Sequence, residues 1–359
     1  MIKSIQGIDN KFRGTVGGNR AWTLCVGAGV SAGIIPIWSN LTKNLVNKVF
    51  EKEYSQEDFV NLTKQLGWGL DSLLQACANE IISNGESVEK FNEYLEYCLY
   101  KDVLEKIDQI GLRSEFCQAL NNPRKLRVKE SKKLLKFFDD NYANTTLVKL
   151  SKVLVKSSLQ DVAPQAIINF NADTLLYAYL DLCLIQQHSE KIGRWLHPSV
   201  AFRKVLRGAS GIIKGTVPIY HCHGALYPAT TQSKSFDSRD QLVFLEESYL
   251  NIASSMATWA QSLFLYHAQH TNLVIAGHSL ADPNIRKWLN WSFESNRKEI
   301  KTLSEATHVA PRHIWITKAP ADEEAKYIQE VGLTHLGVRV CWINEWNEVD
   351  AVLENLLAI

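Results

Sequence analysis

The sequence predicts an α/β fold in which a mostly parallel β-sheet carries helices on both faces. Short apolar runs alternate with longer segments whose apolar residues recur at helical spacing. The first run, residues 22–26, ends abruptly in glycines and is followed by a helical pattern, which outlines a strand, a tight turn and a helix. Such alternation is typical of doubly wound, Rossmann-like sheets.

About six strands are expected in this sheet. They cover residues 22–26, 166–170, 217–222, 272–276, 313–317 and 337–343. After the helix expected at residues 39–50, further helices are expected over residues 174–187, 248–267, 283–297, 322–331 and 349–357. Ligands of such sheets bind at the carboxyl ends of the strands, so the residues that directly follow each strand are the candidates for a site.

Residues 40–158 interrupt the alternation of strands and helices. Apolar residues recur there at helical spacing, with almost no strand signal. The segment, of about 100 residues, is too long for a simple crossover between two strands. We therefore expect a single domain over residues 1–359, with a helical insertion subdomain at residues 40–158 that lies over the ligand site expected at the carboxyl ends of the strands.

Composition indicates an ordinary globular protein, with 46% hydrophobic and 21% charged residues. Lys and Arg number 39 against 38 Asp and Glu, which indicates neither nucleic acid nor an anionic membrane as a partner. The basic stretch at residues 123–133 is interpreted as a solvated helix face, with a polyphosphate or nucleic-acid contact as the alternative.

Targeting signals are not expected. Residues 1–10 lack the apolar core of a signal peptide, and no run approaches the roughly 20 apolar residues of a membrane span. The seven cysteines are scattered without a C-x-x-C pair. They are interpreted as reduced core residues of a cytoplasmic protein, and no zinc ribbon is expected.

The glycine turn after the first strand contains Gly27, Ala28, Gly29 and Ser31. Its pattern G-A-G-V-S-A-G is one residue longer than the dinucleotide fingerprint G-x-G-x-x-G. Glycines there let a phosphate approach main-chain N–H groups, although an ordinary glycine-rich turn would have the same sequence.

Polar residues follow the second expected strand. The amide of Asn171 can donate and accept hydrogen bonds, or it can close the turn. Asp173 can accept from a ribose hydroxyl, or it can cap the following helix. Both alternatives stay open for each residue.

Two histidines lie at the end of the third expected strand. His221 and His223 are two residues apart and would share a face of the strand, but no third Cys or carboxylate ligand is near, and no metal is expected. His223, beside Gly224, is better placed as a general base.

The turn after the fourth expected strand begins with Gly277 and Ser279, where close backbone approach to a ligand would be useful. Asp282 followed by Pro283 is a strong helix start, so we interpret Asp282 as an N-cap.

Six stretches in this order resemble the sirtuin superfamily, and specifically its bacterial sirtuin-like branch with NAD-cleaving activity in antiviral defence. They are G-A-G-V-S at 27–31, P-I-W-S-N-L at 36–41, N-A-D at 171–173, H-G-A-L at 223–226, L-V-F-L-E-E-S-Y at 242–249 and G-H-S-L-A-D-P-N-I-R at 277–286. The chain departs from protein-deacylating sirtuins in lacking two C-x-x-C pairs and in having Ile37-Trp38-Ser39 for Asp-Phe-Arg and Asn169-Phe170 for Thr-Gln. Deacylation loses its support, whereas cleavage of NAD does not.

The resemblance implies an NAD hydrolase that releases nicotinamide and ADP-ribose and acts as an abortive-infection effector. Asn171 would position a water or the ribose hydroxyls, and His223 would be a general base with a pKa near the usual 6.5. The N–H groups from Ala28 to Ser31 would hold the pyrophosphate of NAD. The turn at Gly277 and Ser279 and the carboxylate of Asp173 complete the expected NAD site.

Two other classes of protein fit the sequence less well. A catalytically silent NAD or ADP-ribose sensor that gates a partner has no need of both Asn171 and His223. A hydride-transfer dehydrogenase would place an acidic residue after a second strand, about 20 residues beyond the glycines, but Glu51 and Glu53 follow a helix.

The resemblance also implies a homo-oligomer, with a HerA-type ATPase or another defence protein as a partner. Neither membrane association nor sequence-specific binding of nucleic acid is expected.

Overall fold

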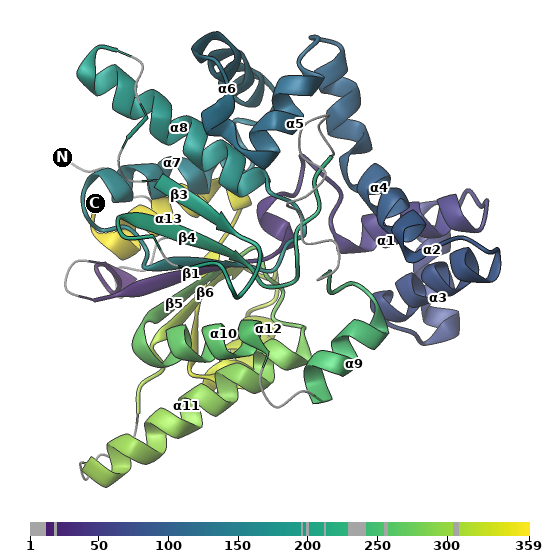
Figure 1. Ribbon diagram of the computed structural model, residues 1–359. Helices are drawn as coiled ribbons and strands as arrows, with labels where there is room; N and C mark the ends of the chain where they lie inside the picture. The colour runs from purple at the N-terminus through teal and green to yellow at the C-terminus, as the bar shows by residue number, and fades with distance from the viewer. Residues whose placement is uncertain are drawn as a thin grey trace.

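In the computed structural model, a seven-stranded sheet with the order β3-β4-β2-β1-β5-β6-β7 forms the centre of the fold (Figure 1). Every adjacent pair of strands is parallel. The strands are β1 (Trp22–Val26), β2 (Ala166–Asn169), β3 (Ala201–Val205), β4 (Thr216–His221), β5 (Asn272–Ala276), β6 (His313–Lys318) and β7 (Val338–Ile343). The expected doubly wound α/β class is confirmed.

The structure describes residues 12–17, 20–194, 197–198, 201–211, 213–228, 242–254, 258–303 and 309–359. The segment 1–10, for which no signal peptide is expected, lies outside these ranges.

The sheet has one strand more than the six expected. Each expected strand is present, and without the edge strand β3 the order β4-β2-β1-β5-β6-β7 is that of the Rossmann sheet. The order reverses at β1, because β2 lies on one side of it and β5 on the other. The carboxyl edge beside β1 is therefore the topological switch point at which ligands of such sheets bind.

Alternate residues of the strands pack on opposite faces of the sheet. Trp22, Leu24 and Val26 of β1 belong to one buried cluster, and Cys25 belongs to the other. This burial on both faces explains why the strands are almost uniformly apolar.

Helices cover both faces (Figure 1). One buried cluster joins the sheet to α8 (Leu175–Ile192) and α13 (Val349–Leu357), and the other joins it to α10 (Trp259–His270), α11 (Pro283–Leu303) and α12 (Glu323–Leu333). The remaining short elements outside the insertion are η2 (Ala28–Val30), α9 (Glu246–Ser254), η5 (Thr334–Leu336) and η6 (Trp346–Glu348). The prediction of a single helix over residues 248–267 is wrong, because α9 and α10 are separate helices. Residues 255–257, between them, lie outside the described part.

The segment between β1 and β2 is helical, as expected. It contains α1 (Trp38–Val49), α2 (Gln56–Leu66), α3 (Leu70–Ser83), α4 (Val88–Asp108), α5 (Arg113–Asn121), η3 (Pro123–Lys125), α6 (Val128–Tyr142) and α7 (Thr146–Leu159). These helices share one buried cluster with the strands, and α7 packs on α8 and α13. The start of α2 is fixed by local sequence, because Ser55 and Asp58 form a capping box there.

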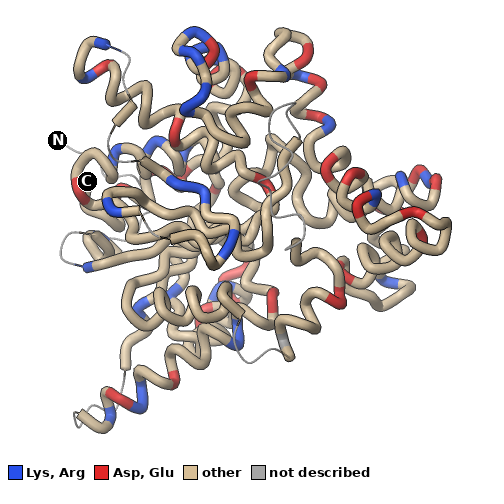
Figure 2. Tube along the Cα trace, viewed as in Figure 1, with Lys and Arg blue, Asp and Glu red and all other residues tan. Residues whose placement is uncertain are grey.

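Basic residues of the stretch 123–133 differ in their surroundings. Several exposed lysines lie on α6, where basic segments gather in Figure 2, and for these the solvated-face interpretation is confirmed. It is wrong for Arg124, whose Nε lies 3.0 Å from an oxygen of the fully buried Asp181. That pair ties η3 to α8.

All seven cysteines are buried and free, which confirms their interpretation as core residues. None of the helices in the described ranges combines the length and the apolar character needed to cross a membrane.

Candidate functional site

Four loops meet at the carboxyl edge of the sheet, because they follow four neighbouring strands. The strands lie in the order β4-β2-β1-β5, and the loops begin at Cys222, Phe170, Gly27 and Gly277. This edge therefore gathers the residues that the sequence points to, as the parallel topology requires.

The glycine turn packs directly on the loop after β5. The Gly29 N–H donates to the Gly277 carbonyl oxygen at 2.8 Å. A Cβ atom at Gly27 would lie 2.7 Å from that same oxygen, and one at Gly29 would lie 2.9 Å from it. The glycines are thus required by contact between two backbones.

The N–H groups of this turn are mostly occupied. Ala28–Val30 form η2, so the Val30 N–H donates to the Gly27 carbonyl and the Ser31 N–H to the Ala28 carbonyl. The expectation that all N–H groups from Ala28 to Ser31 face a pyrophosphate is therefore wrong for three of them. Among the described residues none accepts from the N–H of Ala28, which is exposed.

Gly277→Ala is expected to destabilise the fold by about 2–5 kcal/mol. Gly277 has φ +63°, and an added Cβ would lie 2.5 Å from the Val30 nitrogen. The matched control is Gly67→Ala, since Gly67 has φ +65° but no atom within 4 Å of an added Cβ. Chemical denaturation measures both free energies of unfolding; equal losses would contradict the close contact between the loops.

Asp173 links the glycine turn to α8. Its carboxylate accepts from the Ser31 hydroxyl at 3.0 and 3.1 Å and from the Leu175 N–H at 2.9 Å. Burial raises the pKa of Asp173 to about 6, although these hydrogen bonds favour the charged form. The structure thus bears out the capping alternative, and both Asp173 and Ser31 position the turn.

Asn171 is held from two sides and keeps one acceptor unused. Its N–H donates to Asn169 Oδ1 at 2.9 Å, and its Nδ2 donates to the Gly27 carbonyl oxygen at 3.0 Å. Its Oδ1 is buried without a hydrogen-bond partner. Leaving a buried acceptor unpaired costs about 1–3 kcal/mol, which a ligand hydroxyl or a water could offset.

His223 lies against two aromatic rings. Its ring centroid is 5.1 Å from that of Phe170 and 5.9 Å from that of Tyr249. Only 7% of the residue is exposed, and its ring nitrogens form no hydrogen bond with a described residue. Burial lowers the pKa of His223 to about 4, so the expected pKa near 6.5 is wrong. The ring is neutral at pH 7 and able to accept a proton.

His221 has different neighbours from His223. Its ring is fully buried, with Nδ1 3.4 Å from the Asn171 carbonyl oxygen. Burial, with a smaller contribution from the charge of Lys204, lowers its pKa to about 3. His221 therefore supports the loop that contains Asn171. Within the described ranges, no group of three or more His, Cys, Asp or Glu side chains could hold a metal ion.

Sequence reasoning missed three side chains that line this edge. Phe170 contacts both His223 and His278, and the ring centroid of His278 is 5.6 Å from that of Phe170. Tyr249 approaches His223 from α9. Tyr249 and His278 do fall inside stretches that resemble the sirtuin superfamily, and this is the signal that could have found them.

His278 has a defined tautomer. Its Nδ1 accepts from the Leu280 N–H at 2.9 Å, so the neutral ring carries its proton on Nε2 and can donate from there. Burial lowers the pKa of His278 to about 4, with a smaller contribution from His223, while the charge of Asp282 opposes the shift. A neutral donor thus lies beside the Phe170 ring, which His223 also contacts.

The loop after β5 also contains Ser279 and Asp282. Ser279 is exposed, and its Oγ accepts from the Ala281 N–H at 3.2 Å. Asp282 accepts from the Asn284 N–H at 2.8 Å, which confirms it as the cap of α11.

The chain belongs to the class of doubly wound α/β proteins, whose ligands bind at the topological switch point of the sheet. A family model described as a SIR2-like domain matches residues 165–336, somewhat less than half of the chain. The match supports a relationship to the sirtuin-like superfamily, whose SIR2-like domains use NAD. No curated protein matches the chain.

The matched residues include Asn171, Asp173, His223, Gly277 and Ser279. The glycine turn precedes them in the sequence, but the hydrogen bond from Gly29 to Gly277 joins it to the matched part. The matched residues at the carboxyl edge and the glycine turn are thus one structural unit.

Proposed function

We propose that this protein is an NAD hydrolase that cleaves the bond between nicotinamide and ribose. The observation that carries the proposal is that the carboxyl edge of the sheet holds both the unpartnered Asn171 Oδ1 and a neutral His223 ring, on the loops after the neighbouring strands β2 and β4. One group can hold a hydroxyl or a water, and the other can accept a proton.

The reaction balances with these two groups. Water adds its oxygen to C1′ of the ribose, and the C1′–N bond breaks with its electron pair passing to the nicotinamide ring nitrogen. The pyridinium charge is thereby neutralised, and no acid is needed. Asn171 Oδ1 orients the water or a ribose hydroxyl, and His223 takes the proton that water loses. The products are nicotinamide and ADP-ribose.

A comparison of substrates separates the alternatives. The full chain is incubated with NAD alone and with NAD plus an acetyl-lysine peptide, and nicotinamide is quantified. A hydrolase releases nicotinamide equally in both samples. A deacylase would require the peptide, and a silent sensor would bind NAD without releasing nicotinamide in either sample.

In the cell, we propose a cytoplasmic effector of antiphage defence that stops phage replication by depleting NAD. Such an enzyme must have an inactive state, which fits control by assembly as a homo-oligomer or with a HerA-type ATPase. The resemblance of the six stretches, which occur in the order of the sirtuin superfamily, supports this role by analogy.

The helical insertion contacts the proposed site through two elements. The Tyr100 hydroxyl of α4 donates to the Leu226 carbonyl at 2.8 Å, and the Leu226 N–H donates to the Ala172 carbonyl at 2.7 Å. On α9, which carries Tyr249, the Glu247 N–H donates to Gln75 Oε1 of α3 at 3.3 Å. A shift of these helices would therefore move the neighbours of His223 and Asn171.

If the insertion controls access to NAD, activity per chain is expected to rise steeply with protein concentration or on addition of a partner. NAD is expected to protect backbone amides within residues 40–158 from hydrogen exchange. Exchange mass spectrometry with and without NAD measures this protection. Full activity in a dilute monomer, with unchanged exchange over these residues, would contradict control by the insertion.

A further inference from the structure

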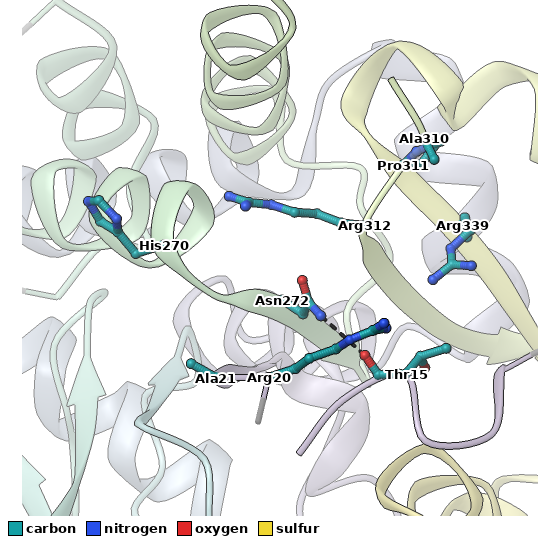
Figure 3. Close-up of a pocket in the computed structure, with 9 residues that line it drawn as sticks. All are labelled: Thr15, Arg20, Ala21, His270, Asn272, Ala310, Pro311, Arg312 and Arg339. Atoms are coloured by element: carbon teal, nitrogen blue, oxygen red, sulfur yellow. Dashed lines mark hydrogen bonds between the residues drawn. The ribbon is translucent and has the colours of Figure 1, made fainter. Parts of the chain in front are cut away.

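A cavity lies at the amino edge of the sheet, opposite the proposed NAD site. It has a volume of about 560 Å³ and lies where β1, β5, β6 and β7 begin. Its lining includes Arg20, His270, Asn272, Arg312 and Arg339 (Figure 3). This volume is within the range of about 300–1,000 Å³ that is usual for small-molecule sites.

The topology brings three arginines together here. Arg20 precedes β1, Arg312 precedes β6, and Arg339 lies in β7. Because β1, β5, β6 and β7 are consecutive parallel strands of the sheet, their first residues meet at one edge. Parallel strands place their carboxyl ends, with the residues of the proposed NAD site, at one edge of the sheet. They place these three arginines at the opposite edge.

The arginines have no carboxylate partner among the described residues, and no described carboxylate lines the cavity. The Nε atoms of Arg312 and Arg339 are buried without a hydrogen-bond partner. Among the described residues, Arg312 donates only to the Ala268 carbonyl, and the Arg339 guanidinium lies 5.2 Å from the centroid of the Phe12 ring. Most of the donors of these side chains therefore have no acceptor in the part of the chain that the structure describes.

Holding these charges together is costly. Burial lowers the pKa of Arg312, and burial together with the charge of Arg20 lowers that of Arg339. The guanidinium groups nevertheless stay charged at pH 7. An anion would offset both the desolvation and the mutual repulsion.

The donors form two groups. In Figure 3, Arg312 extends toward His270, whereas Arg20 extends toward Arg339. Between them, Asn272 donates from Nδ2 to the Thr15 carbonyl oxygen at 3.2 Å, which fixes its side chain. An elongated ligand with more than one negative group fits this arrangement better than a single small ion.

We propose that this cavity binds a small phosphate-bearing molecule of nucleotide size, with its phosphate groups held by Arg20, Arg312 and Arg339. Guanidinium groups bind phosphate through paired, charge-assisted hydrogen bonds. The site is separate from the proposed NAD site and does not depend on NAD cleavage.

Titration calorimetry of the full chain with inorganic pyrophosphate tests the site. The wild type is expected to bind, and Arg339→Gln and Arg312→Gln are each expected to weaken binding about tenfold or more. Arg20→Gln, at an exposed position, is expected to weaken binding without any cost to the fold. The matched control is Arg297→Gln, which also removes one positive charge but lies on the surface beside Glu294; it should leave binding unchanged.

Thermal unfolding without pyrophosphate provides a check on folding. Because Arg20 and Arg339 repel each other, the Arg20→Gln variant is expected to melt no lower than the wild type. Absence of binding by the wild type, binding that survives in all three cavity variants, or equal weakening by Arg297→Gln would overturn the proposal.

Discussion

His223→Ala is expected to slow NAD cleavage by about 100- to 10,000-fold, the usual contribution of a general base. The buried ring is neutral at pH 7, contacts Phe170 and Tyr249, and forms no hydrogen bond with a described residue. Its nitrogens are thus available to a reacting water. Release of nicotinamide under saturating NAD measures the effect.

Two further variants separate catalysis from folding. His223→Gln keeps most of the side-chain volume but cannot act as a base near pH 7, so it should lose activity while melting close to the wild type. His221→Ala should lose less activity and more thermal stability, because the His221 ring is fully buried against the Asn171 backbone. Equal loss of activity and stability in both alanine variants would instead make both histidines structural.

Acidification from pH 6.5 to pH 5 is expected to lower the free energy of unfolding by several kcal/mol. Among the described residues, five histidines have pKa values lowered to about 3 or 4 in the folded chain, mainly because burial disfavours their charged form. They are His221 and His313 at about 3, and His223, His267 and His278 at about 4. In the unfolded chain each binds a proton near pH 6.5.

Stability falls in acid because the unfolded chain binds more protons than the folded chain. The stability from these histidines is fully present above pH 6.5 and is lost as the pH falls toward 4, at about 1.4 kcal/mol per pH unit for each proton that only the unfolded chain binds. Asp173 and Asp181, with pKa values raised to about 6 by burial, act in the opposite direction. The histidines are more numerous, so the net effect is loss of stability in acid.

Calorimetry of thermal unfolding at several pH values between 5 and 7.5 measures this dependence. His313→Asn is expected to weaken the fall in melting temperature with acid, because Asn binds no proton in this range. Asn can still accept the hydrogen bond that His313 Nδ1 receives from the Leu273 N–H, so the variant is expected to fold. His335→Asn, at an exposed position, should leave the curve unchanged. A melting temperature independent of pH over this range would show that the buried histidines gain protons without unfolding.

Most of the sheet could be predicted from the sequence, because strands buried on both faces are continuous apolar runs. The edge strand β3 could not. Its sequence, A-F-R-K-V, carries Arg203 and Lys204, and three of its five residues are only half-buried. Charged residues are common on edge strands, so this strand lacks the pattern that identified its neighbours.

The site was only partly predictable. Parallel topology was enough to bring Asn171 and His223 to one edge. The role of Gly29 could not be foreseen, because its partner is the backbone of Gly277, about 250 residues away in the sequence. The lowered pKa of His223 likewise depends on burial between Phe170 and Tyr249, which come from different elements of the fold.

Release of nicotinamide and ADP-ribose from NAD, compared between the wild type and Asn171→Ala, tests the proposed reaction most directly. Both proteins are assayed over a range of concentrations, and NAD binding is measured on the same samples. The wild type is expected to release the two products in equal amounts, and Asn171→Ala is expected to bind NAD but release almost none. Equal release by both proteins, or NAD binding by the wild type without any nicotinamide at every concentration, would contradict hydrolysis at this site.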